Sequence, residues 1–108
     1  MGLDQAINDI KTDLNFIEAI SLYNVKTQEC RFTDNRTYGC KLSSHLCRTE
    51  LSENSKFIYL EVENESFFAH YNMESLLIAK MKNDIEINQV ILQLKIDKFH
   101  RYVIMNNN

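Results

Sequence analysis

The sequence predicts an α+β fold, a single domain over residues 1–108 in which helices pack on a five-stranded antiparallel sheet. Two observations favour it. Three apolar runs of strand length follow one another between Lys56 and Lys82, separated only by Asn64-Glu65 and by Glu74. Segments with helical periodicity lie towards both ends of the chain. The expected order of elements is therefore α-β-β-α-β-β-β-α.

The first half of the chain supplies the elements before the three runs. Apolar residues recur every three or four positions near the N-terminus, as one face of a helix requires. A β-rich run over 16–23, a turn over 24–27 and a returning strand over 28–33 follow. A short second helix is expected next. The apolar positions of the two helices are Leu3, Ile7, Ile10 and Leu14 in the first, and Leu42, Leu46, Cys47 and Leu51 in the second.

The three consecutive strands carry apolar side chains on both faces, so we expect the sheet to be covered on both sides. After Asn83-Asp84 a helix is expected over 85–104. Its apolar face is broader than one side of a sheet demands. Ile87, Val90, Ile91 and Leu94 form one stripe, and Leu92, Ile96, Phe99 and Val103 widen it.

Composition and charge narrow the class of function. The net charge is −3, from 12 basic and 15 acidic residues, which argues against a nucleic-acid surface. No apolar run approaches the roughly 20 residues of a membrane helix, and the N-terminus lacks the pattern of a secretory signal. We therefore expect a cytoplasmic protein without membrane contact, whose three cysteines are reduced thiols.

No catalytic, cofactor or metal site is expected. Gly39 is the one interior glycine, which excludes glycine-rich phosphate loops. Acidic residues near the second hairpin are typical of a solvated strand rather than of a catalytic pair. The cysteines and histidines match no zinc spacing, and none has the surroundings of a nucleophile. The acidic residues are Glu61, Glu63 and Glu65. The cysteines are Cys30, Cys40 and Cys47, and the histidines are His45, His70 and His100.

Aromatic residues concentrate in the first two of the three strands. They are Phe57, Tyr59, Phe67, Phe68 and Tyr71. A five-stranded sheet with two or three helices does not easily bury all of them, and large apolar groups left at a surface mark interfaces. Because a small domain gains core by dimerising, we expect self-association through this region.

The chain resembles the roadblock/LC7 family, which has a profilin-like domain. A helix leads into the hairpin FIEAISLYNVKTQECRF, with Asn24 and Lys26 where the family usually has Asp-Gly. A short helix, the strands KFIYLEVENESFFAHYN and SLLIAKMKND, and the terminal helix IEINQVILQLKIDKFHRYV follow. The resemblance covers nearly the whole chain and rests on pattern.

This resemblance implies a non-enzymatic homodimer whose sheets join edge to edge across a two-fold axis. It also implies a role in regulating or recruiting a small Ras-like GTPase, or as an adaptor. The implied contacts fall on the second helix and on the strand after it. They are Leu42, Leu46, Leu51, Phe57, Ile58, Tyr59, Leu60 and Val62.

Two other classes stay open at this point. One is a PAS-like or profilin-like sensor domain that binds a small molecule between sheet and helices, which a cavity would favour. The other is a small cysteine-dependent enzyme, in which Cys40 would act with a histidine.

Overall fold

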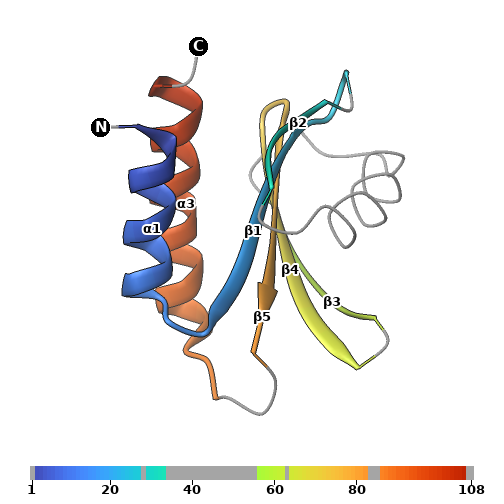
Figure 1. Ribbon diagram of the computed structural model, residues 1–108. Coiled ribbons are helices and arrows are strands. Elements are labelled where there is room, and N and C mark those ends of the chain that lie inside the picture. The colour runs from blue at the N-terminus through green and yellow to red at the C-terminus, as the bar shows by residue number, and fades with distance from the viewer. Residues whose placement is uncertain (1, 28, 34–55, 63, 83–85, 107–108) are drawn as a thin grey trace.

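Five strands form one antiparallel sheet in the computed structural model, and two helices lie side by side on one of its faces (Figure 1). The structure describes residues 2–27, 29–33, 56–62, 64–82 and 86–106. The predicted α+β fold is confirmed. The predicted second helix, 42–51, lies outside the described residues.

The five strands occur close to their predicted positions. β1 and β5, far apart in the sequence, pair in the middle of the sheet over seven register positions, and β3 and β2 are the two edge strands. The spatial order is β2-β1-β5-β4-β3. The bounds are Ile17–Asn24 for β1, Cys30–Thr33 for β2, Lys56–Val62 for β3, Glu65–Asn72 for β4 and Ser75–Met81 for β5.

The two tight turns between the last three strands differ slightly from the prediction. Glu65 was expected in the first turn, but it pairs with Val62, so the connection comprises residues 63 and 64. The second turn comprises Met73 as well as Glu74. Asn64 and Met73 have positive φ values of 67° and 57°. Two-residue hairpin turns require such backbone because their twist then matches that of the strands.

Helix α1 spans Leu3–Asp13, and α3 spans Gln89–Asn106. The expectation that the last helix begins at residue 85 is wrong. The side chain of Asn88 accepts hydrogen bonds from the backbone N–H of Val90 at 3.1 Å and of Ile91 at 3.2 Å, which makes it the N-cap. Residues 86–88 are therefore not helical.

The sheet is buried on both faces, as the strand pattern predicts. On one face, α1 and α3 pack over β1, β4 and β5. The opposite face holds a second cluster that contains neither described helix. The first cluster is Ala6, Ile7, Ile10, Leu14, Ile17, Ile20, Leu22, Phe68, Leu77, Ala79, Met81, Leu92, Ile96, Phe99 and Val103, and the second is Tyr23, Phe67, Ala69, Tyr71, Leu76 and Ile78. Within the described residues, neither helix is long and apolar enough to cross a bilayer.

Candidate functional site

Strand β3 is the feature of the described residues best suited to association. It is seven residues long, pairs with β4 on one side and has no described strand on the other. The two-residue turn makes Val62 and Glu65 a hydrogen-bonded pair, so pairing alternates from there along the strand. The backbone N–H and C=O groups of Phe57, Tyr59 and Glu61 consequently point away from β4, towards the open edge.

The predicted interface residues of β3 divide between the two faces of the sheet. Phe57 is half-buried against the helix-side cluster and stacks on the ring of His70, with centroids 4.3 Å apart. Ile58 and Leu60 are half-buried against the opposite cluster. Tyr59 is 40% exposed, and its hydroxyl accepts a hydrogen bond from Gln93 Nε2 of α3 at 3.2 Å.

The remaining predicted interface residues are less informative. Val62 closes the register of β3 with β4. Leu42, Leu46 and Leu51 lie outside the described residues. The expected surplus of aromatic side chains is smaller than predicted, because Phe67, Phe68 and Tyr71 are all buried. Among the five aromatic residues, the one exposed is Tyr59, which lies on the edge strand itself.

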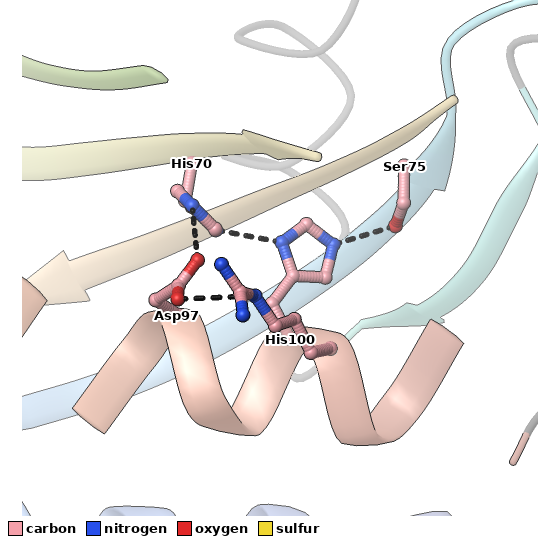
Figure 2. A network of polar contacts seen from close by, with 5 residues as sticks. His70, Ser75, Asp97 and His100 are labelled. Carbon is pink, nitrogen blue, oxygen red and sulfur yellow. Dashed lines mark hydrogen bonds and ion pairs between the residues drawn. The ribbon is translucent and has the colours of Figure 1, made fainter. Parts of the chain in front are cut away.

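A buried polar network links β4, β5 and α3 (Figure 2). His70 Nδ1 and His100 Nδ1 are 2.8 Å apart, and His100 Nε2 lies 2.7 Å from Ser75 Oγ. Asp97 Oδ1 lies 3.5 Å from His70 Nε2, a charge contact too long for a good hydrogen bond. Arg101 Nε pairs with the other Asp97 oxygen at 3.1 Å.

The Asp97 carboxylate sets the direction of the hydrogen bonds in this network. A carboxylate accepts but does not donate, so the favourable tautomer of His70 has its proton on Nε2, facing Asp97. His70 Nδ1 then accepts from His100 Nδ1–H. His100 Nε2 is left without a proton and accepts from the Ser75 hydroxyl. Both rings are neutral in this arrangement, and Ser75 is the donor at its end.

Burial keeps both imidazoles neutral. Neither histidine has exposed surface. Loss of hydration lowers the pKa of His70 to about 4, although the charge of Asp97 opposes the shift. Burial also lowers the pKa of His100 to about 3, with a further contribution from His70. Such a weak base is poorly matched to proton transfer near neutral pH.

The sequence pattern contains little sign of this network. From the sequence, His70 and His100 were considered as metal ligands or as partners of a nucleophile, and neither role was expected. Instead, both are buried and neutral. The available signal was weak: His70 alternates with Phe68 along β4, and His100 lies four residues from Ile96, so each shares a face with a core residue.

An unexpected apolar surface lies on α3. Val90, Ile91 and Leu94 are 67%, 45% and 67% exposed, whereas Leu92, Ile96, Phe99 and Val103 are buried. The breadth of the predicted apolar face thus reflects one buried stripe and one exposed group. Gln93, which follows Val90 by three residues on α3, bonds the Tyr59 hydroxyl, so this part of α3 lies beside β3.

The cysteine and metal hypotheses gain nothing from the described residues. Cys30 is exposed on β2, while Cys40, His45 and Cys47 lie outside the described ranges. No three metal-ligating side chains come together in the part of the chain that the structure describes. Comparison of the chain with protein-family models gives no match, and comparison with curated proteins gives no relative.

Proposed function

We propose that the protein is a homodimeric, non-enzymatic interaction module of the cytoplasm. Its two copies join through antiparallel pairing of their β3 strands, and the dimer regulates or recruits a small Ras-like GTPase or serves as an adaptor. The observation that supports the dimer is the position of β3, a seven-residue strand at the edge of the sheet. The choice of a small GTPase as the partner rests on the resemblance of the sequence pattern to the roadblock/LC7 family.

The backbone of β3 is suited to this pairing. A long edge strand with half-buried apolar side chains is a template for another strand, and proteins that stay monomeric usually shorten, bend or cover it. The other edge strand, β2, has four residues, and its pairing with β1 is interrupted by a bulge between Leu22 and Tyr23. β3 pairs with β4 in unbroken register. It is therefore the better of the two edges for association.

The two-fold axis is best placed beside Tyr59. The outward-pointing residues are Phe57, Tyr59 and Glu61, so a register centred on Tyr59 pairs every outward N–H with a carbonyl of the second copy. Stable interfaces bury roughly 1,200–2,000 Å² in total, more than one strand pair provides. We therefore include the sequence-predicted surface of Leu42, Leu46 and Leu51 in the proposed contact.

The test is the mass in solution of the wild type and of a Tyr59→Pro variant. Light scattering at about 10 μM is expected to give twice the 12.7 kDa chain mass for the wild type. Proline removes the outward N–H of Tyr59 without touching the ladder with β4, so the variant is expected to be a folded monomer. Tyr59→Phe keeps that N–H and should remain dimeric. A monomeric wild type, or a dimeric Tyr59→Pro, would contradict the proposal.

The partner is tested separately. Tagged protein is used to capture small GTPases from a native lysate, with GDP or a non-hydrolysable GTP analogue added. We expect a small GTPase to be enriched in one nucleotide state, and to be lost with Tyr59→Pro if binding needs the dimer. Absence of any small GTPase would refute this partner while leaving the dimer intact.

A further inference from the structure

A cavity of about 210 Å³ lies where the β1–β2 hairpin, the β4–β5 turn and the last turns of α3 meet. Leu22, Val103 and Ile104 give it apolar walls, and Ser75 opens into it. An engineered apolar cavity of roughly 150 Å³ is enough to hold benzene. The size and walls of the cavity thus suit a molecule of about one aromatic ring.

The polar network determines what Ser75 offers to this cavity. Its hydroxyl proton is directed at His100 Nε2, 2.7 Å away, because the charge of Asp97 sets the tautomers of both histidines. A hydroxyl that donates its one proton keeps two lone pairs. The Ser75 oxygen is therefore an acceptor towards the cavity, and a complementary ligand has to bring a donor.

The charged residues of the cavity favour an uncharged ligand. Arg31 and Glu74 both contribute to the lining, and their charges are opposite. Glu74 is also engaged outside the cavity, where its carboxylate lies 2.8 Å from Lys26 Nζ. A cation would meet Arg31 and an anion would meet Glu74, so an ion of either sign would lose hydration beside a like charge.

We propose that this cavity binds a small neutral one-ring molecule that carries a hydroxyl or N–H donor, and that the donor bonds to the Ser75 oxygen. The contacts from Asp97 through His70 to His100 direct the Ser75 proton at His100. The Ser75 oxygen is thereby left to accept a hydrogen bond from the ligand. This binding site lies away from the β3 edge and does not depend on dimer formation.

The test uses phenol as the probe and anisole as its matched control, with amide chemical shifts of the full chain as the readout. Anisole has the same ring, but its oxygen has no proton to donate. We expect saturable shifts for phenol at Ser75, Val103 and Ile104. The dissociation constant should be roughly fivefold lower for phenol than for anisole, the factor that corresponds to a net hydrogen bond of ordinary strength.

Three variants assign the effect to the cavity. Ser75→Ala should remove the preference for phenol over anisole, whereas Ser66→Ala, on β4 outside the network, should keep it. Ile104→Trp should fill the cavity and abolish the phenol shifts. The proposal is overturned if phenol causes no saturable shift in the wild type, or if phenol and anisole bind it equally well. It also fails if Ser75→Ala retains the preference.

Discussion

At the scale of single residues, the two buried histidines make stability depend on pH. Both rings are neutral in the folded chain, with the pKa of His70 lowered to about 4 and that of His100 to about 3. The unfolded chain takes up protons near the ordinary value of 6.5. Stability is therefore complete above about pH 6.5 and is lost as pH falls towards the folded-state values. Between pH 7 and 5 we expect a loss of roughly 2 kcal/mol for each histidine.

Urea unfolding at pH 7, 6 and 5 checks this prediction. Carboxylates titrate mostly below pH 5, so this window isolates the histidines. A His100→Phe variant should show a shallower dependence on pH than the wild type, because one buried imidazole is gone. An equally steep dependence in the two proteins would rule out the buried pair as its source.

Met73 is a second residue with a measurable consequence. Its φ of 57° lies in the left-handed region, and its side chain is 77% exposed. In this backbone conformation a non-glycine residue is less stable than glycine by roughly 1–2 kcal/mol. Part of the gain from glycine is offset, because glycine raises the conformational entropy of the unfolded chain. Met73→Gly is expected to stabilise the fold by about 0.5–1 kcal/mol in urea unfolding. Glu74→Gly, at the other turn position, is the control and should destabilise the fold. If Met73→Gly also destabilises the fold, the backbone at Met73 is not strained.

At the scale of elements, the sequence shows where helices and strands lie better than which helix face is buried. The expectation of apolar side chains on both faces is confirmed for β3, because Phe57 packs against the helix-side cluster while Ile58 and Leu60 pack against the other. Apolar residues surround much of α3, so periodicity alone left two candidate stripes. Which stripe is buried follows from how α3 packs on β4 and α1, a tertiary contact that the pattern does not contain.

This assignment of faces predicts unequal mutational costs along α3. Leu92 has no exposed surface, whereas Leu94, two residues later, is 67% exposed. Leu92→Ala should destabilise the fold by about 2–5 kcal/mol, as buried leucine truncations do. Leu94→Ala should stay within about 0.5 kcal/mol of the wild type. Thermal unfolding of the two variants compares the same chemical change on opposite faces, and similar costs would contradict the packing of α3.

The start of α3 carries its own prediction. Asn88 caps two backbone N–H groups, which the periodicity from residue 85 did not reveal. Asn88→Ala should lower the free energy of unfolding by about 1 kcal/mol. Asn88→Asp should preserve it, since aspartate caps equally well and its charge suits the helix N-terminus. Equal losses in both variants would show that the amide of Asn88 has another role.

At the scale of the whole molecule, the candidate sites differ in how far the sequence reveals them. The β3 strand was predicted as an interface through the family resemblance, and the structure independently places it at an edge. The polar network was not predicted, because His70 and His100 are 30 residues apart and meet only when α3 packs on β4. The cavity was not located for the same reason, since β1, β5 and α3 enclose it jointly.

The proposed dimer has a further consequence for the unfolding of the whole molecule. If two copies unfold as one unit, each tenfold rise in protein concentration adds about 1.4 kcal/mol to the stability of the dimer. For a unit of twice 108 residues, this corresponds to a rise in melting temperature of roughly 3–5 °C. Tyr59→Pro should melt at a temperature independent of concentration, because its β3 edge no longer pairs. Calorimetry at 5, 50 and 500 μM distinguishes the wild type from the variant. If the melting temperature of the wild type stays constant over this range, its folding does not depend on association.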